Sequence, residues 1–165
     1  MRSKIWNEMV NIKYGEIYLS KYSGLQRTLK KSFNILTLVL SISGILGWKF
    51  FENYVWIAFV LIAIMQLFNL IENEIVRSDK EVAKISKLKM QYTKYFHKLE
   101  MLWTEYHFER ITEKKATDQY FKLRKKFWVN IEKLDSKLNI KRYEKIMRKT
   151  EKETKHYIKK YHNYE

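Results

Sequence analysis

The chain has 165 residues, enough for one ordinary domain or two small ones, and its 33 Lys and Arg against 18 Asp and Glu give a net charge of +15. The absence of Cys excludes disulfide scaffolds, thiolate zinc sites and cysteine nucleophiles. With no Pro and four Gly, the chain lacks the residues that multi-strand folds need at their turns, so we expect an all-α protein.

Residues 3–19 carry apolar side chains at helical spacing among Lys, Asn and Glu. These apolar residues are Ile5, Trp6, Met9, Val10, Ile12, Ile17 and Leu19. The pattern predicts an N-terminal amphipathic helix that ends at Ser23-Gly24. The sequence leaves two placements open for this helix: flat on the cytoplasmic surface of a membrane, or packed on a cytoplasmic bundle.

Two runs, residues 32–48 and 53–71, contain no charged residue and have 17 and 19 residues. If Lys49 extends its amine outward, the first run reaches residue 51, which corresponds to about 30 Å of helix. The second run corresponds to about 28 Å, close to the roughly 30 Å thickness of the apolar part of a bilayer. We therefore predict a two-helix transmembrane hairpin with spans of about 32–51 and 53–71. The alternative is a buried hairpin in a soluble bundle, but the rest of the chain is too polar to cover it.

The segment between the two runs, residues 49–54, is short and aromatic. Together with Trp48 and Trp56 it supplies five aromatic rings, as expected where two helix ends meet one membrane interface. On the other side of the membrane, Lys and Arg near the spans outnumber the single Lys49 of the loop. The positive-inside rule therefore predicts that both termini are cytoplasmic.

Beyond residue 71, apolar and aromatic residues alternate in steps of three and four, the heptad period of helix–helix association. The positions are Ile75, Ser78, Val82, Ile85, Lys89, Tyr92, Phe96, Leu99, Trp103 and Tyr106. We expect the second span to continue into the cytoplasm as one helix of about fifty residues. Because this seam is aromatic and one helix pair need not cover it, it also predicts self-association into a homo-oligomer.

A turn is expected within residues 112–117, and a second apolar stripe follows it. The stripe consists of Tyr120, Leu123, Phe127, Ile131, Leu134 and Leu138. It predicts a helix that folds back on the preceding one, so that the two form a long cytoplasmic helical hairpin. Residues 148–165 are mostly polar, and we expect a mobile or loosely docked tail. The expected organisation is an N-terminal helix in 1–31, a transmembrane hairpin in 32–71 and a basic cytoplasmic region in 72–165.

The residues of the chain give no indication of catalysis. The four His have no spacing that would place two on one helix face with a carboxylate, as a metal or hydrolase motif requires. The sequence contains no Gly-rich phosphate loop and no nucleophile elbow. We therefore predict that the protein is not an enzyme and has no metal or other cofactor.

Polar residues at helical spacing form a stripe in each apolar run. The candidates are Asn34, Thr37, Ser41 and Gly44 in the first run, and Gln66, Asn69 and Asn73 in the second. Polar side chains in hydrocarbon need partners or water, so both stripes should face protein or a lumen. They either pack helices together or line a pore made by several copies. Without a charged ring in either run, a selective ion filter is not expected.

The densest basic cluster of the cytoplasmic region is residues 122–126, with aromatic residues on both sides. Arg124, Lys125 and Lys126 could bind a nucleotide or nucleic acid, because cations pair with phosphates and aromatic rings stack on bases. The alternative is a general attraction to anionic lipid headgroups.

The layout of a basic N-terminal helix, a tight membrane hairpin and a helical cytoplasmic region resembles the SLATT domain. The local resemblance is best at residues 25–29, Leu-Gln-Arg-Thr-Leu, which lead through Asn34 into the first apolar run. SLATT proteins are two-transmembrane effectors of bacterial nucleotide-signalling defence systems. The resemblance implies an inner-membrane protein that responds to a cyclic oligonucleotide made by a partner enzyme, read directly or through another protein.

The expected function is therefore that of a membrane effector of anti-phage defence. It would oligomerise, perforate or depolarise the bacterial inner membrane and arrest growth of the infected cell. The alternative is a membrane-anchored scaffold or receptor that recruits nucleic acid or a protein partner through its basic cytoplasmic helices.

Overall fold

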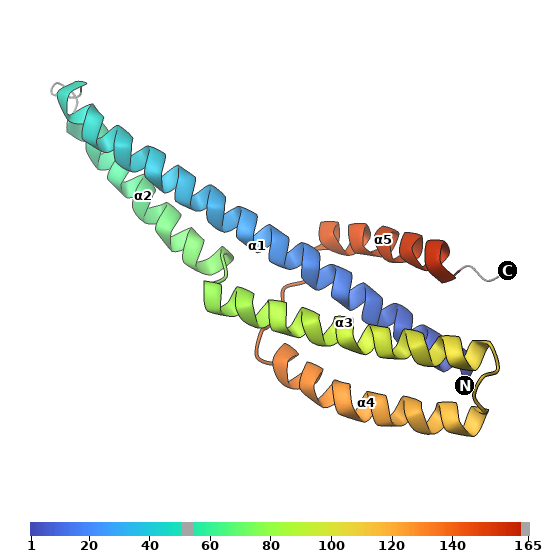
Figure 1. The fold of residues 1–165 in the computed structure, drawn as a ribbon. Helices are drawn as coiled ribbons and strands as arrows, with labels where there is room; N and C mark the ends of the chain where they lie inside the picture. Colours follow the sequence, from blue (N-terminus) through green and yellow to red (C-terminus); the bar gives the residue numbers. More distant parts are fainter. Residues whose placement is uncertain (51–54, 163–165) are drawn as a thin grey trace. The chain divides into compact units, whose positions relative to one another are not determined.

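A computed structural model describes residues 1–50 and 55–162, with their side chains except at 42–50, 55, 58 and 73. These residues form five α-helices, which confirms the prediction of an all-α fold (Figure 1). The helices are α1 (Arg2–Phe50), α2 (Val55–Ile75), α3 (Asp79–His107), α4 (Glu113–Asp135) and α5 (Glu144–His162).

The chain divides into two compact units. Met1–Ser23 and Lys80–Glu165 form one unit, called the bundle below, and Gly24–Asp79 forms the other, called the apolar hairpin. The boundaries differ from the expected divisions at residues 31 and 71, because the first 23 residues pack with the C-terminal half of the chain.

Among the residues that the structure describes, no helix has the length and apolar character needed to cross a membrane. Two of the expected features lie at least partly outside the described residues and side chains. They are the aromatic loop at residues 49–54 and the end of the first expected span, which includes Gly44.

The N-terminal part of α1 packs inside the bundle. Ile5, Met9 and Ile12 are 0–3% exposed, so the second of the two open placements for this helix is the one observed. The expected helix end at Ser23-Gly24 is wrong, since α1 continues without interruption to Phe50. One Gly inside a helix costs only about 1 kcal/mol, which the burial of Tyr22 and Gln26 on either side can offset.

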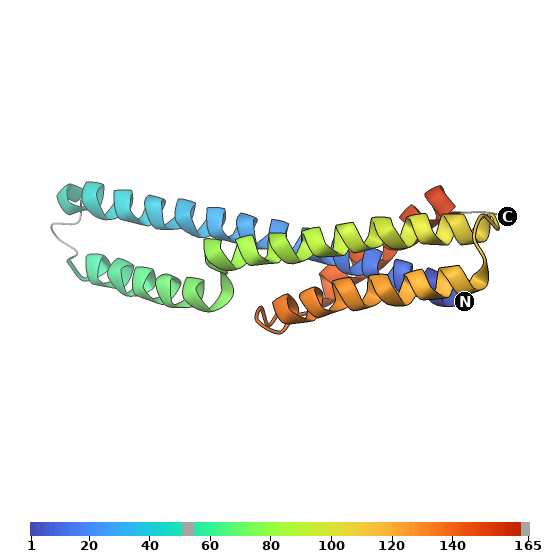
Figure 2. The same cartoon turned by 60° about the horizontal axis from the view of Figure 1, so that its bottom comes forward.

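The α3 and α4 helices lie side by side and antiparallel, as the sequence predicted (Figures 1 and 2). Most of the expected seam residues of α3 and the stripe residues of α4 are buried or packed against the core. The turn lies just before the expected segment: Thr112 is the N-cap of α4, and its hydroxyl accepts a hydrogen bond from the Lys115 N–H at 3.4 Å. The bundle's own helices cover the seam, so it no longer supports self-association.

The expected fifty-residue helix is broken between Ile75 and Asp79, where α2 ends and α3 begins. A continuous helix would direct the Arg77 N–H to the carbonyl four residues earlier. Instead, this N–H donates to the side-chain oxygen of Gln26 at 2.9 Å. The amine of Lys30 also lies 2.5 Å from a carboxylate oxygen of Asp79, so two contacts from α1 hold the break in place.

For the C-terminal segment, where a mobile or loosely docked tail was expected, the structure has a docked helix: residues 144–162 form α5, which packs against the core of the bundle. Thr150 and Thr154, which are small, are almost fully buried at the contact. The Lys13 amine of α1 lies 4.0 Å from the centre of the Tyr157 ring, and Lys21 forms an ion pair with Glu153. Close packing of Thr and Tyr side chains thus holds a helix whose composition is polar.

A carboxylate lies at the polar centre of the bundle. The two oxygens of Glu8 accept hydrogen bonds from the hydroxyl groups of Tyr95 at 3.0 Å and Tyr120 at 3.1 Å. The Arg124 Nε atom lies 3.8 Å from the same carboxylate. Both tyrosines are nearly inaccessible to solvent, and burial followed by the charge of Glu8 raises their pKa values.

We expect Glu8→Ala to lower the free energy of unfolding by about 2–3 kcal/mol, because it leaves the buried Tyr95 and Tyr120 hydroxyls without their acceptor. Circular dichroism of the full chain during urea unfolding measures the change. The matched control is Glu132→Ala at an exposed position of α4, which should alter stability by less than about 0.5 kcal/mol. Equal effects of the two substitutions would show that Glu8 has no special role in the core.

The buried tyrosines also predict a loss of stability in alkali. Burial, followed by the charge of Glu100, raises the pKa of Tyr157 to about 12, above the ordinary tyrosine value of about 10. The folded chain therefore keeps this proton where the unfolded chain loses it, so stability is complete below pH 10 and falls as the pH rises towards 12. Thermal unfolding between pH 8 and pH 12 should show a smaller loss for Tyr157→Phe than for the parent chain. Parallel curves would refute this contribution.

Candidate functional site

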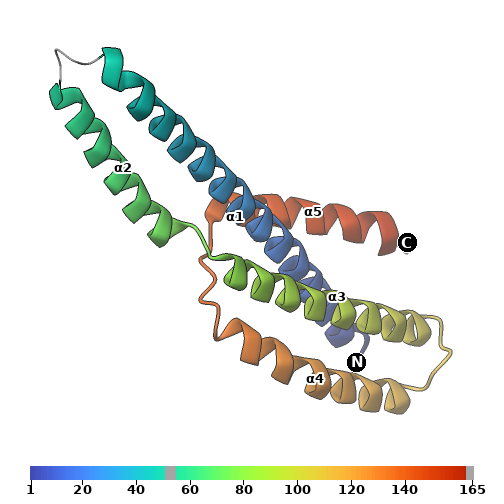
Figure 3. The ribbon, with the colours of Figure 1, turned by 60° about the vertical axis from the view of Figure 1, so that its left-hand side comes forward.

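The apolar hairpin contains the C-terminal part of α1 and all of α2 (Figure 3). Both helices expose many large apolar side chains. They are Ile35, Leu36, Leu38 and Val39 of α1, and Trp56, Phe59, Val60, Ile62, Ile64, Leu67, Leu70, Ile71 and Ile75 of α2. By contrast, the large apolar side chains that are buried, among those described, all belong to the bundle. An apolar surface of this extent marks a contact with another apolar phase or molecule.

The polar candidates of the apolar runs have two different environments. Thr37 and Ser41 are half-buried, and the Ser41 hydroxyl donates to the Thr37 carbonyl at 2.8 Å within α1. Asn34, Gln66 and Asn69 are exposed. The contact between α1 and α2 includes instead the rings of Phe33 and Phe68, whose centres are 6.4 Å apart. Packing within one hairpin therefore leaves these three amides exposed. The surroundings of Gly44 and the side chain of Asn73 are outside the described part.

The structure separates the three candidates of the basic cluster. Arg124 contacts Glu8 at the polar centre of the bundle and lies 5.8 Å from the centre of the Trp128 ring. Lys125 and Lys126 extend from the exposed side of α4. Arg124 thus has a structural partner, and the two lysines do not share its environment.

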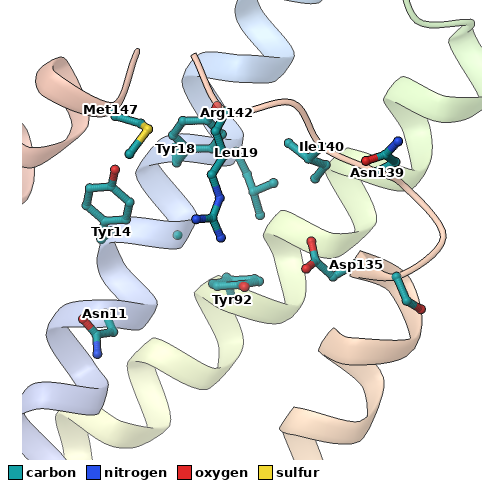
Figure 4. Close-up of a pocket in the computed structure, with 12 residues that line it drawn as sticks. Asn11, Tyr14, Tyr18, Leu19, Tyr92, Asp135, Asn139, Ile140, Arg142 and Met147 are labelled. Carbon is teal, nitrogen blue, oxygen red and sulfur yellow. The ribbon is translucent and has the colours of Figure 1, made fainter. Parts of the chain in front are cut away.

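A pocket of about 640 Å³ lies in the bundle between α1, α3 and the connection from α4 to α5 (Figure 4). Its walls include the rings of Tyr14, Tyr18 and Tyr92 and the polar side chains of Asn11, Asp135, Ser136, Asn139 and Arg142. Burial, followed by the charge of Asp135, raises the pKa of Tyr92, so this ring keeps its hydroxyl proton at neutral pH.

Gly15 determines how closely α3 approaches α1 at this pocket. A Cβ atom at Gly15 would lie 2.3 Å from the Cε1 atom of Tyr92, far inside the van der Waals contact distance. The absence of a side chain at residue 15 therefore allows the Tyr92 ring to lie directly against α1. This is the position where the fold requires a glycine.

The Tyr18 hydroxyl fixes the connection that forms one side of the pocket. It donates to the Lys141 carbonyl at 2.7 Å and accepts from the Tyr143 N–H at 3.0 Å, so both neighbours of Arg142 are held. Burial raises the Tyr18 pKa against the opposite effect of the Tyr143 hydrogen bond. Figure 4 shows the Arg142 side chain extending from this connection into the pocket towards Tyr92.

No local pattern in the sequence indicates that these pocket residues meet, because they come from three segments far apart in the chain. One available signal was the series Tyr14, Tyr18 and Tyr22, which recurs at steps of four and predicts one helix face. In the structure the neighbouring rings of this series are stacked, with centres 6.5 Å and 6.2 Å apart.

Comparisons with known proteins gave no match: no family model matches the chain, and neither does any curated protein or solved structure. Within residues 1–50 and 55–162, no group of three or more His, Asp or Glu side chains is arranged to hold a metal ion.

Two glycines of α1 provide a matched pair of substitutions. Gly24→Ala should raise the free energy of unfolding by about 0.5–1 kcal/mol, since Ala favours helix and no atom lies within 4 Å of the added Cβ. Gly15→Ala gains the same helix preference, but the added Cβ displaces Tyr92. Overpacking of this kind costs about 1–3 kcal/mol, so the substitution should be destabilising. Urea unfolding of both full-length variants measures the difference. Equal stabilisation by the two substitutions would contradict the close Gly15–Tyr92 contact.

Proposed function

We propose that this chain is a membrane effector whose apolar hairpin enters a bilayer, assembles with other copies and makes the membrane permeable. The observation that carries the proposal is the exposure of large apolar side chains along α1 and α2 of the hairpin. Exposure of such a surface to water is unfavourable, whereas the interior of a bilayer is apolar like the surface itself.

The uncharged runs of the sequence support insertion. The run at 53–71 has 19 residues, which as a helix correspond to about 28 Å, close to the thickness of the bilayer interior. Helices satisfy their backbone hydrogen bonds internally, as lipid requires. Lys30, Lys31 and Arg77 flank the outer ends of the two uncharged runs, and by the positive-inside rule this favours a cytoplasmic location for both termini.

The exposed amides of the hairpin favour assembly over a simple anchor. An Asn or Gln side chain in hydrocarbon is costly unless it finds a hydrogen-bond partner or water. Asn34, Gln66 and Asn69 are exposed on a single copy, so further copies or a water-filled lumen would supply their partners. Homo-oligomers that expose these amides to a lumen would depolarise the membrane.

The biological setting of the proposal rests on the SLATT resemblance at residues 25–29. It comprises the bacterial inner membrane, anti-phage defence, and control by a cyclic oligonucleotide from a partner enzyme. Gln26 of this motif is the residue that accepts the Arg77 N–H where α2 ends, so one position of the motif has a structural role.

One surface favours the second candidate function, a membrane-anchored scaffold for nucleic acid or protein. The α4 helix exposes Phe121 and Trp128 beside Lys125, and residues 72–165 carry a net charge of +10. Exposed rings among cations can stack on bases and pair with phosphates. A scaffold of this kind would leave the membrane potential unchanged.

The experiment that tests the effector is expression in bacteria with a potential-sensitive dye read in single cells. The parent chain should depolarise the cells, and Gln66→Leu with Asn69→Leu should abolish depolarisation by removing the amides while the protein stays in the membrane fraction. Leu67→Ile with Leu70→Ile is the matched control, since it alters neighbouring exposed positions of α2 without changing their polarity.

Three results would count against the proposal. Depolarisation by the amide double variant at the parent's level would refute assembly through these side chains. Extraction of the parent by high salt without detergent would refute insertion. Normal potential with the parent, also in the presence of cyclic nucleotides, would favour the scaffold.

A further inference from the structure

We propose that the pocket of the bundle is a binding site for a monoanionic or dianionic ligand with a planar ring, of the size of a nucleoside monophosphate. Tyr14 and Tyr92 would contact the ring and Arg142 the anionic group. The inference goes beyond the effector proposal and does not depend on membrane insertion.

Arg142 has the two properties that an anion-binding side chain needs. Its backbone is fixed, because the Tyr18 hydroxyl bonds to the residue on each side of it. Its charge is also available: within the described part of the chain, Arg142 forms no ion pair, although Asp135 lines the same pocket. The Arg142 side chain is exposed, and its guanidinium group can bind a phosphate through two parallel N–H donors.

The rings in the pocket favour a planar ligand. Tyr14 comes from α1 and Tyr92 from α3, and the Arg142 side chain lies between them in the view of Figure 4. Gly15 allows the Tyr92 ring to lie directly against α1 at the pocket wall. Bases stack on tyrosine rings without regard to base identity, so the rings predict a class of ligand and not one base.

Asp135 and Asn11 define the polar part of the ligand. A carboxylate accepts hydrogen bonds from the hydroxyl groups of a sugar, and a side-chain amide both donates to and accepts from a base edge. With one Arg and one Asp in the pocket, a single phosphate is matched better than a chain of several. The volume of about 640 Å³ falls within the range of about 300–1,000 Å³ that is usual for small-molecule sites.

Another hollow of the bundle is less suited to a ligand. It is lined by Lys13, Glu16, Lys21 and Glu153, whose charges pair with each other: Lys13 with Glu16 at 3.0 Å, and Lys21 with Glu153. A ligand would have to break these pairs, whereas no ion pair has to be broken at Arg142.

Isothermal titration calorimetry on the full chain in detergent micelles tests the site with three probes: adenosine 5′-monophosphate, adenosine, and ribose 5-phosphate. We expect the monophosphate to bind at least tenfold more tightly than either probe that lacks the phosphate or the ring. Arg142→Ala should weaken binding of the monophosphate at least tenfold and leave binding of adenosine unchanged. Tyr14→Leu should weaken the binding of adenosine and of adenosine 5′-monophosphate, and leave the binding of ribose 5-phosphate unchanged.

The control variant is Arg148→Ala, an exposed α5 residue that pairs with Glu144 and does not line the pocket. It should bind the monophosphate like the parent, and thermal unfolding should show all three variants folded. Absence of monophosphate binding, equal binding by Arg142→Ala and the parent, or equal binding of ribose 5-phosphate and the monophosphate would each overturn the proposal. These results are independent of depolarisation, so the two proposals can fail separately.

Discussion

The orientation of α1 about its own axis is set by Glu8, which must point at α3 and α4 to reach the hydroxyls of Tyr95 and Tyr120. The Glu8 side chain is 17% exposed, and a mostly covered carboxylate is costly without partners, so this contact favours one rotation of the helix over others. With Glu8 in place, the apolar residues Ile5, Met9 and Ile12 fall on the same side and enter the core. The residues Asn11, Tyr14, Gly15 and Tyr18 then lie on one flank of this face and form the pocket, whereas Lys13, Glu16 and Ser20 lie on the other flank. Core, pocket and α5 contact thus depend on one polar interaction.

The bundle and the apolar hairpin differ in how far their large apolar side chains are buried. The bundle has a core of buried large apolar side chains, and the hydroxyls of Tyr18 and Thr154 have hydrogen-bond partners within the fold, although side chains such as Phe121 and Val129 are exposed. In the apolar hairpin, thirteen large apolar side chains are exposed and none of those described is in the buried core. An apolar surface of this extent is poorly matched to water. This contrast is why the proposed function places the two units in different surroundings.

The sequence predicted the elements whose signals are periodic and local. The seam from Val82 to Trp103 and the stripe from Tyr120 to Leu138 were found because burial repeats at the helical period.

The end of α2 was missed because a side chain 51 residues earlier, Gln26, accepts the hydrogen bond of the Arg77 N–H. The docking of α5 was missed because its buried contact residues include Thr150 and Thr154, which are polar but small enough to pack closely. Gly24 was misread because a glycine marks a helix end only where packing does not hold the helix together. The pocket could not be predicted, since nothing local relates Tyr14, Tyr92 and Arg142.

Charge density and a binding site are different properties in this chain. Residues 122–126 have the highest density of cations, yet the Arg124 side chain contacts Glu8, and Lys125 and Lys126 extend into solvent from α4. A ligand at Arg124 would compete with this contact, and a ligand at the two lysines would meet no pocket wall. Arg142 is also exposed, but it lines a pocket with aromatic rings, and the Tyr18 hydroxyl holds the backbone on both sides of it. Binding of an anion there would break no ion pair among the described residues, and the pocket walls would add specific contacts to the general attraction of a basic protein for anions.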